Sequence, residues 1–450
     1  IRLMVTQRYG RRSERQTDDP TSDLFNEAEA LIEAEEATVA QADHDIVNDA
    51  DSETITYTRK KSKPGRKPIP DHLPREVIEH DLPEADKICD CGEGKTRIGA
   101  ETSERLEYIP ARLYVEQHVR HQYACRCCEE HGVQIAEMPA SILPKSNAGP
   151  GLLAYTLVSK FQDSLPLHRQ STILARHEVD IPRHTLARWH IKASEKIEPL
   201  IKRFEAAMQA SPVILIDETR LQVNKEPNKE ASSQSYMWVR RGVSPPDHPD
   251  DQHRRPDVTL YHYSPSRSGS VAADLLQGYT GAIMTDGYAG YDKVAQSYGL
   301  QHGHCWAHAR RKFVEAEKAL PKGKKSPAIT AILNEIKKLY ALERRIKEST
   351  PDEKVVARQT EAEPILTKLQ QQLEKKQHTV TPKSALGKAI GYTLKYWHGL
   401  TQYLINGNLP IDNNGAENAI RPFVVGRKNW LFSDSVKGAQ SSARWYSMME

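Results

Sequence analysis

The chain has 450 residues, with 63 Lys and Arg against 60 Asp and Glu, and its net charge is +3. This length allows two to four domains. Since no run of 18 apolar residues occurs and no signal peptide is recognisable, the sequence excludes a transmembrane helix and predicts no membrane partner. The chain does not start with Met and stops within a helix-like stretch, so we expect both ends to be cut.

Residues 1–80 carry an uneven charge, and we predict them to be largely disordered. Residues 21–58 hold 11 acidic residues and no Lys or Arg, whereas residues 59–67 hold six basic residues and no acid. The acidic stretch is either a solvated linker or a tail that competes with a polyanion for the basic part of the chain. Arg66 and Lys67 lie in a Gly-Arg-Lys-Pro segment. Such a segment is either a plain linker or an arm that enters an AT-rich minor groove of DNA.

Five of the six cysteines lie between residues 89 and 128, in a segment, 81–148, that we predict to bind zinc. Their number is too small for a disulfide scaffold, and their clustering favours a metal in a reducing compartment. Residues 105–123 alternate as strands do, so cysteine pairs at the two ends of this stretch can converge on one structural Zn²⁺. Cys127 or His131 could replace a ligand, and unliganded buried thiols are the alternative. The expected ligands are Cys89, Cys91, Cys125 and Cys128.

Residues 149–208 have a helical pattern, with two helices over 167–177 and 182–193 joined by a tight turn. The second helix carries Arg183, Arg188 and Lys192. In a helix-turn-helix these side chains would enter the major groove of DNA. An ordinary packed helix pair explains the pattern equally well. We therefore predict a helical, helix-turn-helix-like region with three candidate DNA contacts.

Residues 209–450 have the pattern of a mixed α/β sheet with added helices. Apolar runs at 213–216, 236–239, 258–263 and 281–285, with a helix over 270–277, predict the sheet. Asp217 and Asp286 stand where two of these runs end. Helical periodicity then returns over 305–405, where a stripe of apolar residues that begins at Ile329 predicts a helix packed on one face. Asx residues before Glu417 predict the start of a further helix.

Three acids in this region predict a metal-dependent active site. Ligands gather at strand ends in open α/β sheets, and Asp217 and Asp286 with Glu417 could hold two Mg²⁺ (or Mn²⁺) ions. One ion would activate a water or a 3′-hydroxyl, and the other would stabilise the leaving oxygen. Each aspartate alone is equally well explained as the start of a surface loop.

Basic residues near the acids favour a phosphodiester substrate, because they can hold phosphates while the metals carry the chemistry. A zinc site made of histidines and a cysteine is a less favoured alternative, since no cysteine pair anchors it. Its members would be His302, His304, Cys305 and His308. The candidate phosphate contacts are Arg310, Arg311, Lys312, Arg421, Arg427 and Lys428.

Several motifs, in their order and spacing, resemble those of the transposases of the insertion sequence 66 family. Arg8-Tyr9-Gly10-Arg11-Arg12-Ser13-Glu14 is similar to the family's Phe-Gly-Arg-Arg-Ser-Glu element, and residues 24–29, 65–70 and 73–75 precede the cysteine segment as in the family. The resemblance covers nearly the whole chain. Its further motifs are Leu165-Pro-Leu-His-Arg169, Asp217-Glu218-Thr219, Thr285-Asp286-Gly-Tyr-Ala-Gly-Tyr291, Ala307-His308-Ala-Arg-Arg-Lys-Phe313, Asp412-Asn-Asn-Gly-Ala-Glu417 and Gly426-Arg-Lys-Asn-Trp-Leu-Phe432.

The resemblance implies a ribonuclease-H-like catalytic core of the Asp-Asp-Glu type over 209–450. Asp217, Asp286 and Glu417 match the family's acidic triad. The 131-residue interval between the last two acids would hold a helical insertion, at about 315–385. The sequence departs from the usual zinc knuckle in one respect, because the first cysteine pair is Cys-x-Cys.

The expected function is that of a DNA transposase of an insertion sequence, which binds element ends, cleaves DNA 3′ ends with Mg²⁺ and transfers the strands. Its partners would be the terminal repeats, target DNA, further copies of itself on DNA and small accessory proteins of the same element. The expected location is the bacterial cytoplasm, at the nucleoid. The alternatives are a zinc-containing DNA-binding regulator with an inactive catalytic fold and a general Mg²⁺-dependent nuclease.

Overall fold

The computed structural model describes residues 112–124, 133–244, 257–321 and 326–450. The described residues from His118 onward belong to one compact unit. Strands β1 (Gln122–Ala124) and β2 (Val133–Ile135) pair antiparallel in a small ribbon. The predictions for residues 1–80 and for the four zinc-ligating cysteines lie outside the described residues.

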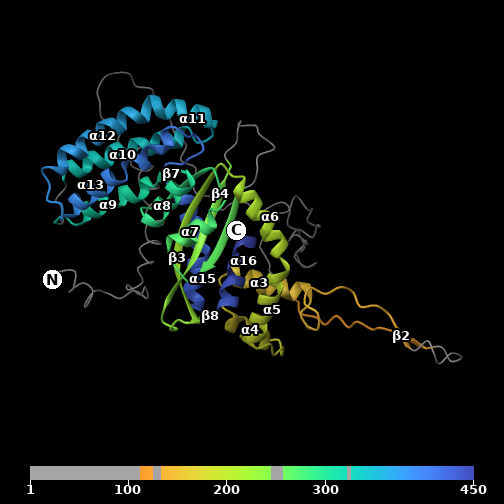
Figure 1. The fold of residues 1–450 in the computed structure, drawn as a ribbon. Coiled ribbons are helices and arrows are strands. Elements are labelled where there is room, and N and C mark those ends of the chain that lie inside the picture. The colour runs from red at the N-terminus through yellow and green to blue at the C-terminus, as the bar shows by residue number, and fades with distance from the viewer. Residues whose placement is uncertain (1–111, 125–132, 245–256, 322–325) are drawn as a thin grey trace, which may run out of the picture. The chain divides into compact units, whose positions relative to one another are not determined.

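The region predicted to be helical forms four consecutive helices (Figure 1). The second and third correspond to the predicted helix pair, and the turn between them contains Glu178 with a positive φ of 61°. Apolar side chains of this region pack against Trp445 and Tyr446 near the end of the chain. The helices are α3 (Pro150–Phe161), α4 (Leu167–Ala175), α5 (Arg183–Lys196) and α6 (Glu198–Gln209).

The centre of the unit is a mixed sheet with the strand order β5-β4-β3-β6-β7, and β8 (Ser433–Ser435) pairs with the far end of β3. Strands β3, β4 and β5 pair antiparallel, whereas β3, β6 and β7 pair parallel. The mixed α/β sheet predicted from the sequence is therefore confirmed. The strands are β3 (Val213–Lys225), β4 (Gln234–Val243), β5 (Val258–Ser264), β6 (Ala282–Thr285) and β7 (Gln301–His304).

Strand β3 is longer than the apolar run that predicts it. The prediction that the strand ends at Ile216 is wrong, because β3 continues to Lys225. Its antiparallel pairing with β4 extends to Gln222, whereas its parallel pairing with β6 stops at Leu215 opposite Met284. Asp217 thus lies within a strand, just beyond the point where the parallel ladder ends.

Alternate side chains of β3 and β6 face two different sets of helices, as the period of two in a strand requires. Ile214, Ile216 and Ile283 pack in the cluster that includes side chains of α7 (Gly269–Leu275) and α8 (Ala289–Tyr298). Val213, Leu215 and Met284 pack instead with the later helices of the chain. Both faces of the sheet are therefore covered.

The later helices form most of the second half of the chain (Figure 1). The helix predicted from the stripe that begins at Ile329 is α10, whose stripe is buried. None of the described helices is both long and apolar enough to span a membrane. These helices are α9 (Trp306–Lys318), α10 (Pro327–Arg345), α11 (Pro351–Ala357), α12 (Glu363–Gln377), α13 (Ala385–Lys395), α14 (Trp397–Thr401), α15 (Asn414–Trp430) and α16 (Val436–Met449).

Candidate active site

The register of two parallel strands places Asp217 beside Asp286. Leu215 of β3 pairs with Met284 of β6, and each aspartate lies two residues further along its chain. Both side chains therefore lie on the same face, at the carboxyl end of the parallel ladder. Asp286 follows the last residue of β6 directly, as the sequence predicts.

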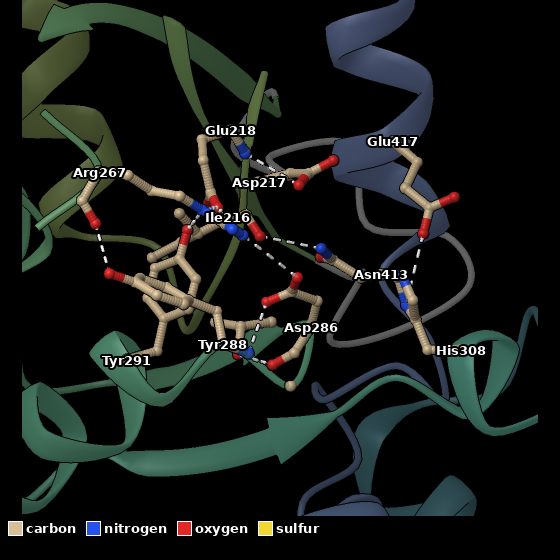
Figure 2. Close-up of polar contacts among 12 residues, drawn as sticks. Ile216, Asp217, Glu218, Arg267, Asp286, Tyr288, Tyr291, His308, Asn413 and Glu417 are labelled. Atoms are coloured by element: carbon tan, nitrogen blue, oxygen red, sulfur yellow. Dashed lines mark hydrogen bonds and ion pairs between the residues drawn. The ribbon is translucent and has the colours of Figure 1, made fainter. Parts of the chain in front are cut away.

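Helix α15 brings Glu417 to the same place. Asn413, which precedes the helix, donates from Nδ2 to the carbonyl of Ile216 at 2.9 Å. Gly415 lies so close to β3 that an added Cβ would come within 2.4 Å of Leu215 Cδ1. Because this close approach fixes the first turn of α15 on the strand, Glu417 is held next to Asp217 (Figure 2).

The carboxyl group of Asp217 is affected by burial and by its acidic neighbours. The pKa of Asp217 is raised well above its ordinary value, first by burial and then by the charges of Glu218, Glu417 and Asp286. Burial also raises the pKa of Asp286. Carboxylates that resist ionisation in this way have a donor set that fits Mg²⁺ or Mn²⁺, because a divalent cation would remove the cost of their charge.

On the other side of the two aspartates lies a polar group that the sequence analysis does not single out as a site. Arg267 is 2.5 Å from Glu218 Oε1 and 3.8 Å from Asp286 Oδ2, and its guanidinium lies 4.4 Å from the ring centroid of Tyr288. Tyr291 donates to Glu218, and the backbone N–H of Tyr288 donates to Asp286 Oδ1 at 2.9 Å (Figure 2). The signal available in the sequence is the Asp-Glu pair and the Tyr-rich stretch after Asp286.

Side chains of α9 line the side of the site next to Glu417. His308 Nδ1 is 3.7 Å from Glu417 Oε1, and Arg311 is 3.8 Å from Glu417 Oε2. Burial, with Arg311 and Lys312, lowers the pKa of His308 to about 3, so the ring is neutral at neutral pH. Burial raises the pKa of the Cys305 thiol well above its ordinary value. His308 can therefore serve as a neutral ligand or hydrogen-bonding group beside the acid.

The zinc alternative considered from the sequence does not form one group. His308 and Cys305 lie near Glu417, whereas His302 and His304 lie near Asp292. The strand β7 ends at His304, and Cys305 begins the first turn of α9, so the two pairs are carried by different elements. The four residues are thus divided between two clusters.

The basic residues predicted near the acids have different surroundings. Arg310, Arg311 and Lys312 lie on α9 and are partly exposed, with Lys312 Nζ 4.6 Å from the ring centroid of Tyr392. On α15, Arg421 is partly exposed and Lys428 is exposed. Arg427 is buried and donates to Thr219 Oγ1 at 2.9 Å and to the carbonyl of Arg220, so its guanidinium fastens α15 to β3.

The predicted DNA contacts on α5 share its exposed side. Arg183, Arg188 and Lys192 are exposed, whereas Leu186 and Trp189 of the same helix are buried. Next to them is a cavity of about 360 Å³, lined by Arg188, Lys192 and Trp189 from α5 and by residues 143–147, which include Lys145. Lys145 was not predicted as a DNA contact, although its charge adds to the basic surface formed by Arg183, Arg188 and Lys192.

Comparison with known families identifies the domain that contains this sheet. The model of the family described as "Transposase IS66 family" matches residues 145–441. The chain belongs to the IS66 family of transposases. The resemblance read from the motifs is thereby confirmed, and the enzyme class is that of a transposase, whose partner is DNA.

Two further family models match the part of the chain before this domain. The "zinc-finger binding domain of transposase IS66" matches residues 86–129, which include all four predicted zinc ligands. The model described as "Transposase C of IS166 homeodomain" matches residues 1–78. The IS66 transposase therefore has a zinc-finger domain of the family, and its individual ligands stay a prediction.

Relatives from Sinorhizobium fredii (strain NBRC 101917 / NGR234) cover most of the chain. The protein printed as "Uncharacterized protein y4jD" is 33% identical over 390 residues, which are 83% of this chain and 72% of the relative. "Uncharacterized protein y4hP" is 29% identical over 453 residues, covering 96% of this chain and 78% of the relative. "Uncharacterized protein y4qI" is 28% identical over 471 residues, covering 100% of this chain and 81% of the relative.

Proposed function

We propose that this IS66 transposase binds the ends of its element, cleaves DNA 3′ ends by Mg²⁺-dependent hydrolysis and joins the freed hydroxyls to target DNA. Asp217, Asp286 and Glu417 are the proposed catalytic acids. The observation that supports this proposal is geometric: Asp217 and Asp286 lie on one face at the end of the parallel strands, and Asn413, at the start of the helix that carries Glu417, donates to the carbonyl of Ile216.

The sheet supports a ribonuclease-H-like assignment for the catalytic core. Strands β3, β4 and β5 are antiparallel, and β6 and β7 are parallel to β3. The first strand of the sheet, β3, therefore has an antiparallel neighbour on one side and a parallel neighbour on the other. Asp217 lies on that central strand, and Asp286 follows its parallel neighbour. Glu417 comes from a helix far along the chain, after a set of helices from α9 to α14 that we assign as the helical insertion.

The chemistry divides between the acids and their neighbours. Two Mg²⁺ (or Mn²⁺) ions, when bound, would activate the attacking oxygen and stabilise the negative charge on the leaving oxygen. Asp217, Asp286 and Glu417 would hold them. Arg267 orients Glu218 and Asp286 through its ion pairs, and His308 stays neutral beside Glu417.

Basic side chains are the proposed contacts to DNA phosphates. Near the acids they belong to α9 and α15, and on the helical region they belong to α5. Arg427 is left out of this set because it is buried against β3. The proposed phosphate contacts are Arg66, Lys67, Arg183, Arg188, Lys192, Arg310, Arg311, Lys312, Arg421 and Lys428.

The zinc segment is proposed to bind one structural Zn²⁺ through Cys89, Cys91, Cys125 and Cys128. Four thiolates are the donor set that closed structural zinc sites use. We also propose that the transposase assembles as a homo-oligomer on the element ends and works with small accessory proteins of the same element, at the nucleoid in the bacterial cytoplasm.

The test is a cleavage and joining assay on DNA that carries the element ends, with and without Mg²⁺. Asp217→Asn, Asp286→Asn and Glu417→Gln should each lower cleavage by about 10³-fold, since several kcal/mol of charge stabilisation are lost. Binding to the same DNA should persist in all three variants. Asp274→Asn, which changes an exposed acid of α7, is the matched control.

Other results would favour other functions. Full cleavage by any of the three variants would remove that residue from the active site. Binding without Mg²⁺-dependent cleavage in the unmodified protein would point to a regulator. Equal cutting of unrelated DNA without joining would point to a general nuclease.

A further inference from the structure

A second group of metal-ligating side chains lies on the face of the sheet opposite Asp217 and Asp286. His302 and His304 are two residues apart on β7, so their side chains share one face of the strand. His302 pairs in register with Ile283, which packs in the cluster with α7 and α8. Helix α8 covers this face and supplies Asp292. We propose that Asp292, His302 and His304 form a zinc site distinct from the carboxylate site.

The distances between these groups are those of zinc ligands. Asp292 Oδ1 is 3.4 Å from His302 Nδ1 and 3.4 Å from His304 Nε2. Ligand atoms around a tetrahedral Zn²⁺, with bonds near 2.0–2.1 Å, are about 3.3 Å apart. One ligand atom from each residue lies within 4.8 Å of the others. The three atoms can therefore coordinate one ion with small adjustments.

A neighbouring hydroxyl sets the orientation of His302. Thr285 Oγ1 donates to the carbonyl of Asp286 at 2.8 Å, so it has a lone pair to accept from His302 Nε2, which is 2.7 Å away. In the tautomer where Nε2 donates to Thr285, Nδ1 of His302 carries the lone pair and faces Asp292 Oδ1 at 3.4 Å. A cation between these two electron-rich atoms would be bound by both. A fixed outer hydrogen bond of this kind is also what metal-binding histidines normally have.

The ring of His304 is held in place by close packing. Its buried Nδ1 has no hydrogen-bond partner, its Nε2 faces Asp292 Oδ1 at 3.4 Å, and the side chain is 8% exposed. The ring stacks on Tyr396 with centroids 4.6 Å apart. On the Nδ1 side the ring contacts Gly399, where an added Cβ would come within 1.9 Å of Nδ1. Nε2 is thus the nitrogen that remains for a ligand, and it faces Asp292.

Both rings are in the form that binds metal. Burial and the neighbouring His304 lower the pKa of His302 to about 3. Burial also lowers the pKa of His304, although Asp292 raises it in part. The ammonium group of Lys395, which acts on His304 electrostatically, donates to the Tyr396 hydroxyl at 3.1 Å. Both imidazoles therefore favour the neutral form at neutral pH, and this is the form that binds a divalent cation.

The donor set selects the metal class. Two imidazole nitrogens and one carboxylate oxygen suit Zn²⁺ better than Mg²⁺, which prefers oxygen ligands. Asp292 is 40% exposed, which gives the ion an entry path and a place for water. Because His302 bonds Thr285, and Thr285 immediately precedes Asp286, zinc at this site would tie α8 and β7 to the segment that presents a proposed catalytic acid.

The test is the zinc content per chain of the full-length protein after loading with Zn²⁺ and removal of unbound ion. The unmodified protein should hold two Zn²⁺, one here and one in the proposed cysteine site. The double substitution His302→Gln with His304→Gln should lose one, and Cys89→Ser with Cys125→Ser should lose the other. His378→Gln, at an exposed histidine that follows α12, is the control and should lose neither.

Equal zinc content in the unmodified protein and the His302→Gln, His304→Gln variant would overturn the proposal. Should that variant fail to fold, Asp292→Asn offers a milder change, because it keeps both rings and alters a partly exposed side chain. It should lower the affinity for Zn²⁺ about 10–100-fold in competition with a chelator, and an unchanged affinity would also overturn the proposal. Zinc content is measured without DNA, so the outcome does not depend on whether the carboxylate site cleaves.

Discussion

Two clusters of metal-ligating side chains lie on opposite faces of one strand end and differ in chemistry. Asp217, Asp286 and Glu417 present only carboxylate oxygens, whereas the histidine cluster presents two imidazoles and one carboxylate, that of Asp292. Thr285 and Asp286 are consecutive, so their side chains point to opposite faces, one toward each cluster. The comparison teaches that a single strand end presents oxygen ligands on one face, where we propose Mg²⁺, and mainly nitrogen ligands on the other, where we propose Zn²⁺.

The largest effect that separates the two clusters is expected from Arg267→Gln. Arg267 pairs with Glu218 and Asp286, so its loss should lower cleavage about 10–100-fold, as is typical when a group that orients metal ligands is removed. The Mg²⁺ concentration needed for half-maximal cleavage should rise, and Arg267→Lys should restore part of the activity. An unchanged Mg²⁺ requirement would show that Arg267 does not position the acids.

A comparable effect on the other cluster is expected from Thr285→Val. Valine keeps the shape of threonine and removes the hydroxyl that bonds His302. The affinity for Zn²⁺ at the histidine cluster should fall about 10–100-fold. It can be measured by chelator competition in the Cys89→Ser, Cys125→Ser background, where the other proposed zinc site is absent. Zinc affinity equal to that of the same background without Thr285→Val would contradict the role of this hydroxyl.

A smaller effect, on stability, is expected from Asp217→Asn in the absence of Mg²⁺. The pKa of Asp217 is raised in the folded protein, so ionising it costs free energy, and stability falls as pH rises from about 4 through the folded pKa. Asparagine does not titrate and avoids this cost. The variant should therefore melt about 2–4 °C higher than the unmodified protein at pH 8.

The pH dependence provides the control for that measurement. At about pH 3, below the ordinary pKa of an aspartate, Asp217 is largely protonated in both the folded and the unfolded state, so the two proteins should differ little in Tm. Added Mg²⁺ should stabilise the unmodified protein more than the variant at pH 8, because the cation relieves the repulsion among the acids. A variant less stable than the unmodified protein at pH 8 would contradict the charge argument.

Much of the fold could be predicted from local patterns. The apolar runs predicted the positions of strands β3 to β6, and the stripe that begins at Ile329 predicted α10. The length of β3 was not predicted, because the charged pair Asp217 and Glu218 interrupts the apolar run before buried and exposed side chains alternate as far as Val223. Antiparallel pairing with β4 continues through this second half. Strand β7 also escaped prediction. Its sequence, Gln301–His304, contains no apolar side chain and becomes a strand only by pairing with β6.

The candidate site shows the same division. Asp217, Asp286 and Glu417 could be selected by their positions after apolar runs and by family resemblance, although their catalytic roles stay a prediction. Arg267 and His308 could not be placed near them from the sequence. Their positions depend on how the loop after β5 and the helix α9 pack against the sheet. Arg427, in contrast, was predicted to contact DNA because it lies in a basic cluster of the sequence, but its side chain is buried in the fold.

The sequence by itself determined the family and the mixed α/β class, and it selected the three candidate acids, because motif order and strand periodicity are local properties of the chain. Only the tertiary structure decided that Asp217 and Asp286 share one face of the sheet end, that the helix of Glu417 begins beside Ile216, and that Asp292 lies close to His302 and His304. Strand register and helix packing bring together residues far apart in the chain, and no local pattern specifies them. The physical reason is that burial and strand pairing depend on contacts across the whole sheet. A hydropathy pattern, in contrast, reflects only the residues of one segment.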